Sequence, residues 1–218
     1  MNKLSDPRVV EGHEKSYRKG IDHHYPNENI VRLIKWFWGK PGKVLDHGFG
    51  PGENLLHLWR CGYDVSGIEV SEVARQITEA KQSGLDLKII DPNDSRLPYE
   101  DESFDYILSN QTVYFLVTGE RIRHLLDEFH RILKPGGKII VTMMSRFSTY
   151  CTNGTPLGHN QYQYLDDGNM NFVYIAKSED HIRDLFKRFK IHEVGHFDNY
   201  YCGVSGHHYV VLAERKEE

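Results

Sequence analysis

Long hydrophobic runs, paired cysteines and an excess of basic residues are all missing from this sequence. The three cysteines, Cys61, Cys151 and Cys202, are scattered, and no Cys-x-x-Cys pair indicates a zinc ribbon or a redox centre. No apolar stretch has the length of a signal peptide or a membrane span, so we expect a soluble, cytoplasmic protein without a membrane partner. The formal net charge of −4 favours a small-molecule partner over a nucleic acid, because nucleic-acid binders usually carry a basic patch.

Two pairs of adjacent histidines, His23-His24 and His207-His208, are the most obvious candidates for metal ligands. Adjacent residues on a strand point to opposite faces of the sheet, so neither pair makes a ready two-ligand site. We therefore expect no metal site.

Short apolar runs alternate with amphipathic stretches between Gly42 and Thr142. This pattern predicts a doubly wound, mostly parallel sheet with helices on both faces. Five strands are expected in this core and two more after it: 43–47, 64–69, 87–90, 104–109, 138–143, 191–196 and 208–213. The length of the chain allows one domain with additions.

Two helices are expected from apolar residues at helical spacing. The first covers residues 119–133, and Pro135-Gly136-Gly137 then turns the chain into the next strand. The second follows Ser178 as N-cap, and its apolar stripe comprises Ile182, Leu185, Phe186 and Phe189.

The chain divides into an N-terminal segment and a core. Residues 1–40 are expected to form a helical cap over a cofactor, with residues 30–38 as a helix that packs across the sheet edge. Residues 41–218 form the core. Within it, residues 146–176 have no clean period and are expected to be a substrate lid or insertion.

A glycine-rich turn follows the first expected strand of the core. Residues 44–53, VLDHGFGPGE, indicate a strand, a turn and the start of a helix, and glycines there let the backbone approach a bound nucleotide closely. Glu69, at the end of the second strand, is placed to hold ribose hydroxyls of either a dinucleotide or another nucleoside cofactor. The glycines alone do not separate these cofactors.

The charges of the glycine turn do separate them. A pyrophosphate at a helix N-terminus favours positive potential, yet the turn carries Asp46 and Glu53 and has no Lys or Arg between Leu45 and Leu58. Carboxylates suit a cofactor with a sulfonium and an ammonium group better than one with two phosphates. The turn therefore indicates S-adenosylmethionine rather than NAD.

Four segments in sequence order resemble the motifs of class I, Rossmann-like S-adenosylmethionine-dependent methyltransferases of the small-molecule type. They are VLDHGFGPG, VSGIEVS, NDSRLPYEDESFDYILS and LKPGGKIIVT, and the match covers about residues 44–142. The resemblance implies a seven-stranded sheet whose last strand is antiparallel. It also implies that S-adenosyl-L-methionine is the cofactor and S-adenosyl-L-homocysteine the product.

The same resemblance implies the residues of the cofactor site. Glu69 binds the ribose, and either Asn93 or Asp94 contacts the adenine amino group. The N-terminal segment of similar enzymes folds over the cofactor, a role for Tyr17 and Tyr25, although an ordinary capping loop explains that segment equally well. The complete set of candidate cofactor-binding residues is Asp46, Gly48, Gly50, Gly52, Glu69, Val70, Asn93, Asp94, Ser95, Asn110, Gln111, Tyr17 and Tyr25.

Two residues are candidates for catalysis. His159 lies in the expected lid and is the first candidate for a general base, if the acceptor is a hydroxyl. Tyr114 stands about where many relatives carry a histidine. Tyrosines interleaved with amides in residues 146–176 favour a small polar acceptor with apolar faces, such as a sugar or sugar nucleotide, with O- and N-methylation both open.

Two other functions share much of this pattern. An NAD-dependent oxidoreductase would have the glycine turn and Glu69, but the acidic turn and the segment 133–142 disfavour it. A non-catalytic S-adenosylmethionine-binding protein stays open, because no single side chain is indispensable to methyl transfer. The sequence is also compatible with a homodimer.

Overall fold

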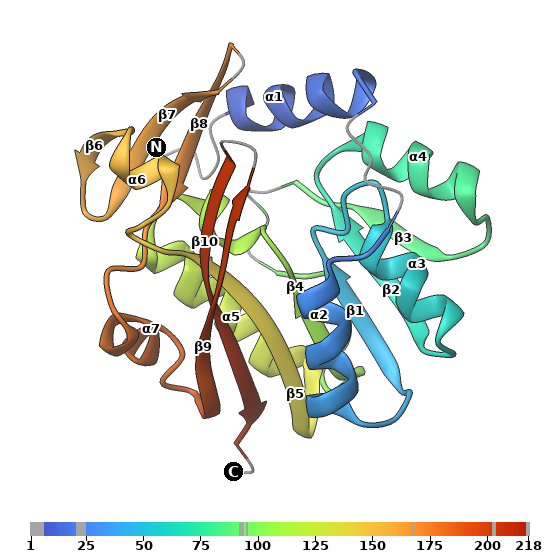
Figure 1. Cartoon of the computed structure of the whole chain (residues 1–218). Coiled ribbons are helices and arrows are strands. Elements are labelled where there is room, and N and C mark those ends of the chain that lie inside the picture. Colours follow the sequence, from blue (N-terminus) through green and yellow to red (C-terminus); the bar gives the residue numbers. More distant parts are fainter. Residues whose placement is uncertain are drawn as a thin grey trace.

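A seven-stranded sheet forms the centre of the computed structural model, which describes residues 7–20, 25–91, 94, 96–166, 168–201 and 204–216 (Figure 1). The strand order is β3-β2-β1-β4-β5-β10-β9. The strands are β1 (Lys43–His47), β2 (Asp64–Glu69), β3 (Asp86–Ile89), β4 (Phe104–Ser109), β5 (Leu133–Met144), β9 (Phe189–Tyr201) and β10 (Val204–Arg215). Neighbours pair in parallel except at β10, which is antiparallel to both β5 and β9. The predicted mostly parallel sheet with an antiparallel last strand is confirmed.

The largest boundary corrections concern the start of β5 and the end of β9, each of which extends five residues beyond the predicted strand. The predicted turn at Pro135-Gly136-Gly137 lies inside the strand, because Leu133 already pairs with Phe104 of β4. The register then shifts, so that Lys138 pairs with Tyr106. Extra residues on one strand are accommodated as a bulge, which explains why the three residues interrupt the ladder without ending it.

Helices cover both faces of the sheet. The helix α5 (Gly119–Ile132) and α7 (Glu179–Leu185) pack on one face, and α2 (Glu28–Leu33) and α3 (Glu53–Arg60) pack on the other. Successive residues of a strand point to opposite faces. Accordingly, Leu45 of β1 lies in the core with α5, and Val44 lies in the core with α2.

The predicted helix over residues 30–38 packs on the sheet face and not across its edge. It consists of α2 and a π-helix, η1 (Ile34–Trp38). The Trp38 ring stacks on Tyr106 of β4 with 4.6 Å between centroids, and Lys138 of β5 donates to the carbonyl of Phe37. Because β4 and β5 are central strands, this contact corrects the predicted position.

The predicted N-cap of α7 is confirmed, whereas its apolar stripe is shorter than predicted. The Ser178 hydroxyl accepts a hydrogen bond from the backbone N–H of His181. Phe186 and Phe189 are both buried, but they lie beyond the helix, and Phe189 begins β9.

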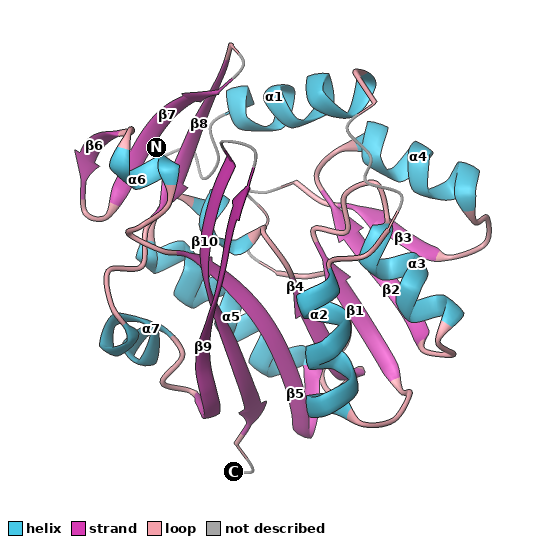
Figure 2. Cartoon of the chain, viewed as in Figure 1, coloured by secondary structure: helices cyan, strands magenta, loops and turns pink. Residues whose placement is uncertain are grey.

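Residues 146–176 contain regular structure that the sequence did not reveal. They form α6 (Thr149–Thr152) and a three-stranded antiparallel sheet of β6 (Thr155–Gly158), β7 (Gln161–Asp166) and β8 (Asn169–Tyr174), apart from the main sheet (Figure 2). Most of these residues are exposed or half-buried. β7 and β8 each begin with alternating polar and apolar residues, Gln161-Tyr162-Gln163-Tyr164 and Asn169-Met170-Asn171-Phe172, so the prediction of no clean period over residues 146–176 missed two short strand patterns.

The helix α1 (Pro7–Arg18) lies between this small sheet and α4 (Glu72–Lys81) (Figure 1). A Cβ on Gly12 would lie 3.4 Å from Asn169 of β8, and Glu14 accepts a hydrogen bond from Ser71, the N-cap of α4. The N-terminal helix therefore bridges two regions that are distant in sequence. Within the described parts of the chain, no helix is long and apolar enough to cross a bilayer.

Candidate functional site

The glycine turn joins the end of β1 to the start of α3. Gly48, Gly50 and Gly52 all have positive φ angles, of 72°, 53° and 90°. A Cβ on Gly48 would lie 2.2 Å from the Thr112 side chain, and one on Gly52 would lie 2.8 Å from Thr78. Side chains are therefore excluded at these two positions by the close packing of the turn on two threonines, as well as by the left-handed backbone.

Glu69 anchors the glycine turn with its side chain. Its Oε2 accepts a hydrogen bond from the backbone N–H of Gly50 at 3.0 Å, and its Oε1 accepts from Val70 and Ser71 at 2.7 and 3.2 Å. Burial raises the pKa of this carboxyl, and the three backbone donors oppose that rise. A carboxylate has about four acceptor sites, so one site on Oε2 stays open for a ligand hydroxyl.

Asp46 is a buried carboxyl with an unused oxygen. Its side chain is 2% exposed, and Oδ2 has no hydrogen-bond partner among the described residues. Burial raises the pKa of Asp46 to about 8, and the nearby carboxylates of Glu53 and Glu69 add to the rise. Three acidic groups thus converge on one turn, where a cationic ligand group would relieve both the repulsion and the unsatisfied oxygen.

A lysine of α4 also contacts this turn. Lys81 donates to the carbonyl of Pro51 at 2.9 Å. That bond satisfies a backbone acceptor of the turn and leaves the carboxyl oxygen of Asp46 unpaired.

The N-terminal helix contacts the glycine turn through Tyr17. Its phenolic oxygen would be 3.5 Å from a Cβ on Gly50. Burial raises the pKa of Tyr17, and the carboxylates of Glu69 and Glu53 raise it further, so this phenol stays protonated beside the acidic turn. Tyr25 has an exposed fraction of 69%, and its role over the cofactor stays a prediction.

The carboxyl end of β4 lies beside the glycine turn, because β4 pairs with β1. There Gln111 has a φ angle of +56°, which is unusual for a residue with a side chain, and its N–H donates to Thr142 at 2.6 Å. The Thr142 hydroxyl also donates to the side-chain Oδ1 of Asn110 at 3.5 Å. Strained backbone of this kind concentrates at functional sites, which agrees with the predicted position of both residues.

The predicted adenine-binding segment is described only in part. Asp94 is exposed, and its backbone N–H donates to the carbonyl of Asp91 at 2.9 Å. Asn93 and Ser95 lie outside the described residues. The choice between Asn93 and Asp94 therefore stays a prediction.

His159 lies exposed in the turn between β6 and β7, with a φ angle of +49°. The next residue, Asn160, donates to the Tyr174 hydroxyl, which in turn contacts His181 of α7. This end of the hairpin is about 17 Å from Asn169, where β8 meets α1, at 3.3 Å per residue. The described contacts thus tie the turn of His159 to α7 and not to the glycine turn.

Tyr114 is buried beside His208, which the sequence singled out as one of two adjacent histidines and not as a partner of Tyr114. Tyr114 lies on a 3-10 helix, η2 (Val113–Leu116), and its hydroxyl is 3.4 Å from Nε2 of His208. Both side chains are buried, and burial lowers the pKa of His208 to about 4. The alternation of His208 with Val210 and Leu212 could have indicated a buried face, but the partner is 94 residues away.

A row of ring contacts connects this pair with the N-terminal helix. His13 of α1 packs edge-on against Phe115 at 4.7 Å, and Phe115 packs on Tyr114 at 4.8 Å. On the other side, His208 stacks on Phe197 of β9 at 5.4 Å. Rings from three distant segments therefore meet beyond the carboxyl ends of β4 and β5.

The two adjacent histidines near the end of the chain point in different directions, as predicted. The His207 ring bonds to Asp198 at 2.8 Å, whereas His208 faces Tyr114. His23 and His24 lie outside the described residues. A further buried histidine, His47, bonds to Ser109 at 2.9 Å within the sheet.

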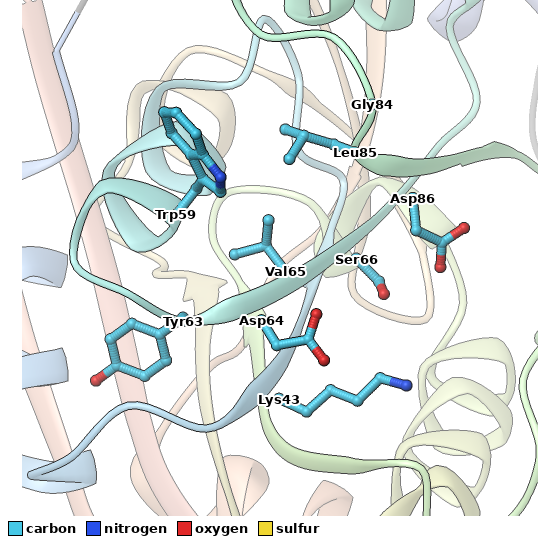
Figure 3. A pocket seen from close by; sticks show the side chains of 9 residues that line it. All are labelled: Lys43, Trp59, Tyr63, Asp64, Val65, Ser66, Gly84, Leu85 and Asp86. Carbon is cyan, nitrogen blue, oxygen red and sulfur yellow. The ribbon is translucent and has the colours of Figure 1, made fainter.

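The hollow in Figure 3 lies at the amino ends of the strands, whereas the glycine turn lies at their carboxyl ends. It is lined by Lys43, Asp64 and Asp86, which begin β1, β2 and β3, together with side chains such as Trp59 and Tyr63. Ligands of doubly wound sheets bind beyond the carboxyl ends of the strands. We therefore place the site at the glycine turn and not in this hollow.

The comparison with protein families agrees with this location. A family model described as a methyltransferase domain matches residues 45–141, which include the glycine turn and Glu69. Phosphoethanolamine N-methyltransferase 2 from Caenorhabditis elegans is 28% identical over 188 residues, covering 79% of this chain and 41% of that protein. The chain spans 18% to 63% of the length of the curated relatives compared here.

Solved structures share the fold over nearly the whole chain. A methyltransferase from Methanosarcina mazei has a TM-score of 0.71 at 19% identity and covers 89% of this chain and all of its own. A Burkholderia thailandensis 1,6-didemethyltoxoflavin N1-methyltransferase, solved with its acceptor and S-adenosylhomocysteine, has a TM-score of 0.69 at 16% identity. That match covers 97% of this chain and 88% of the other. At these identities the likeness shows the fold.

Proposed function

The chain belongs to the class I, Rossmann-like S-adenosylmethionine-dependent methyltransferases, and from this premise we propose that it methylates a small polar acceptor. The acidic glycine turn is the observation that carries the proposal. Asp46 has an unpaired buried oxygen, and Glu53 and Glu69 lie close enough to raise its pKa. A turn with this charge suits a cationic cofactor and would repel the phosphates of NAD.

Different residues of the turn would bind different groups of the cofactor. Asp46 would pair with its ammonium group, and the open acceptor site on Glu69 would take one ribose hydroxyl. The backbone near Gly50, held by Glu69, fixes the shape of the turn. When bound, the cofactor supplies a methyl group that is already activated by its sulfonium.

The chain's remaining task is to align the acceptor and to exclude water. Asn110 and Gln111 would line the methyl end, because they follow β4 next to the turn. We propose that α1 covers the cofactor through Tyr17, and that the small sheet of residues 146–176 covers the acceptor. The contacts of α1 with both β8 and α4 support this arrangement.

For the acceptor we propose a sugar or sugar nucleotide, methylated on oxygen or nitrogen. Aromatic rings and polar groups lie together on α6 and the small sheet: the Tyr150 ring of α6 is 5.2 Å from the Tyr164 ring of β7, and Asn171 pairs with Tyr164 across the hairpin. Rings of this kind stack on apolar sugar faces, while amides bond hydroxyls. The relatives named above act on other small polar molecules, an ethanolamine phosphate and a toxoflavin precursor.

Calorimetric titration of the purified protein with S-adenosylhomocysteine, and with NAD in parallel, tests the cofactor. We expect saturable one-to-one binding of the former and none of the latter. A transfer assay with labelled S-adenosylmethionine and a panel of sugars and sugar nucleotides then tests the acceptor. Cofactor binding without transfer to any of a broad acceptor panel would favour a non-catalytic binding protein, and binding of NAD alone would overturn the proposal.

A further inference from the structure

Tyr114 and His208 occupy the acceptor side of the ligand-binding edge. Tyr114 follows the end of β4, and His208 pairs in register with Met144, the last residue of β5. The strand order runs β1-β4-β5-β10, so three strand spacings, about 14 Å, separate β10 from the glycine turn at the end of β1. His208 therefore lies beyond β4 and β5 from the glycine turn, at the same end of the sheet.

The polar atoms of this pair are buried and incompletely satisfied. The exposed fractions are 3% for Tyr114 and 4% for His208. The Tyr114 hydroxyl lies 3.4 Å from Nε2 of His208, and Nδ1 of the same ring has no partner among the described residues. An unpaired buried polar atom costs about 1–3 kcal/mol, so native proteins usually satisfy such atoms with a ligand or water.

The imidazole is uncharged near neutral pH. Burial is the main cause of its lowered pKa, the neighbouring His207 lowers it further, and Asp198 opposes the effect. The other surroundings of the ring are Phe197, stacked on it, and Met144, opposite it on β5. A neutral imidazole has one nitrogen that donates and one that accepts.

The hydrogen-bonding capacity left in the pair is the same for both tautomers. If Tyr114 donates to Nε2, the Nδ1–H and the lone pairs of the phenol are free. If Nε2–H donates to Tyr114, the Nδ1 lone pair and the phenolic proton are free. In each case the pair offers one unused donor and at least one unused acceptor on atoms that point away from each other, which matches a ligand with separate hydroxyl groups.

We propose that Tyr114 and His208 form a specificity-determining pair that binds uncharged hydroxyl groups of the acceptor. This proposal rests on the proposed function and narrows its substrate to a hydroxyl-bearing, polyol-like molecule. An ammonium group only donates and a carboxylate only accepts, so each leaves one partner of the pair unsatisfied. The acceptor is thus selected by a neutral pair from β10 and η2, and the cofactor by the acidic turn.

The chain offers a matched control for the experiment. A second tyrosine–histidine pair, Tyr174 and His181, has a 2.8 Å contact between the Tyr174 hydroxyl and Nε2 of His181. Its contact is with His181 of α7 and not with His208, although Val173 and Ile175, on either side of Tyr174, pack with Tyr114. The variants Tyr114→Phe and Tyr174→Phe each remove one hydroxyl and keep the ring. His208→Phe keeps an aromatic ring that can stack on Phe197. The imidazole NMR signals that disappear in this variant are those of His208.

The test uses ¹⁵N-histidine-labelled protein saturated with S-adenosylhomocysteine, followed by long-range imidazole NMR. The hydroxyl probe is methyl α-glucoside, tetrahydropyran is the same ring without hydroxyls, and 4-aminotetrahydropyran is the ammonium probe. We expect methyl α-glucoside to shift the His208 signals saturably. The apparent affinity from this titration should be at least tenfold lower in Tyr114→Phe and unchanged in Tyr174→Phe. Neither other probe should shift the His208 signals.

Three results would overturn the pair's role: no shift of His208 with methyl α-glucoside, an equal response in Tyr114→Phe, or an equal response to the ammonium probe. Calorimetry with S-adenosylhomocysteine distinguishes a failure of the pair's role from a failure of cofactor binding. Its Kd should stay within twofold in Tyr114→Phe and His208→Phe, which also shows that the variants fold. Absence of S-adenosylhomocysteine binding in the wild type would refute the proposed function instead.

Discussion

The two halves of the proposed ligand-binding edge are built in different ways. The cofactor half is centred on one backbone turn: Glu69 accepts a hydrogen bond from the backbone N–H of Gly50, and the glycines of the turn fit against Thr112 and Thr78. The acceptor half uses buried side chains from distant segments, with Tyr114 bonding His208 across 94 residues. The first half is charged and backbone-mediated, whereas the second is neutral and side-chain-mediated.

The largest effect is expected where the cofactor half is packed most tightly. Gly48→Ala forces a methyl group onto Thr112 and strains a residue at φ +72°. We expect the free energy of unfolding to fall by roughly 4 kcal/mol, from overpacking and backbone strain together, and the affinity for S-adenosylhomocysteine to fall at least about 100-fold. Chemical denaturation and calorimetry measure the two effects.

Gly62→Ala is the control for this substitution. Gly62 has a φ angle of +86°, but its Cβ would meet no atom within 4 Å. It should lose only about 1 kcal/mol and keep its affinity for the cofactor product. Equal losses in the two variants would mean that the backbone angle alone matters and that the turn is not tightly packed.

The next effect concerns the side chain that joins the turn to β2. Glu69→Ala removes the acceptor of three backbone N–H groups, and we expect both a loss of about 3 kcal/mol in unfolding free energy and weaker binding of S-adenosylhomocysteine. The exposed ion-paired Glu72, replaced by Ala, is the control and should change either quantity little. Weaker binding at unchanged stability would assign Glu69 to the ribose alone.

A pH-dependent effect is expected at Asp46. Its pKa of about 8 in the folded protein exceeds that of an unfolded aspartate, near 3.9, so the unfolded chain holds fewer protons between about pH 4 and pH 8. Folding stability from this group therefore falls as the pH rises through that window. Asp46→Asn should gain at least about 1.4 kcal/mol relative to the wild type between pH 5 and pH 8 in denaturation experiments. A pH-independent difference would show that Asp46 is ionised throughout.

The smallest effect is expected on the acceptor side, at His159. Because this exposed residue has a φ angle of +49°, His159→Gly should raise the free energy of unfolding by about 0.5–1 kcal/mol. His159→Ala tests the predicted base separately, in the methyl-transfer assay. From the position of the turn we expect its rate to match the wild type, and a tenfold slower rate at unchanged S-adenosylhomocysteine affinity would establish the base.

Local sequence was enough to predict most of the cofactor half. Strands β1, β2 and β4 have the predicted bounds, and the glycine turn follows β1 as expected. Buried parallel strands give short apolar runs, and glycine and charge at their ends mark the turn. The presence of Asp46 and Glu53 without a basic residue was readable in the same ten-residue segment.

Three features outside the glycine turn escaped this reasoning for physical reasons. The polar and apolar residues of β7 and β8 alternate only over short runs among Gly and Asn, and both strands are mostly half-exposed, so the segment as a whole has no clean period. The bulge at the start of β5 depends on pairing with Phe104, which no local pattern encodes. The helix over residues 30–38 has an apolar face, but only the path of the chain decides that this face meets Tyr106 in the middle of the sheet.

The sequence alone therefore determined the fold class, the cofactor turn and its acidic character, because these follow from periodicity, glycine and charge within short segments. Only the tertiary structure decided how the second site is assembled. It turned Glu69 into an anchor of the turn, left an oxygen of Asp46 unpaired, and brought Tyr114 to His208. Burial and long-range pairing set the hydrogen-bond partners and pKa values of these groups, and both arise only when strands distant in sequence become neighbours.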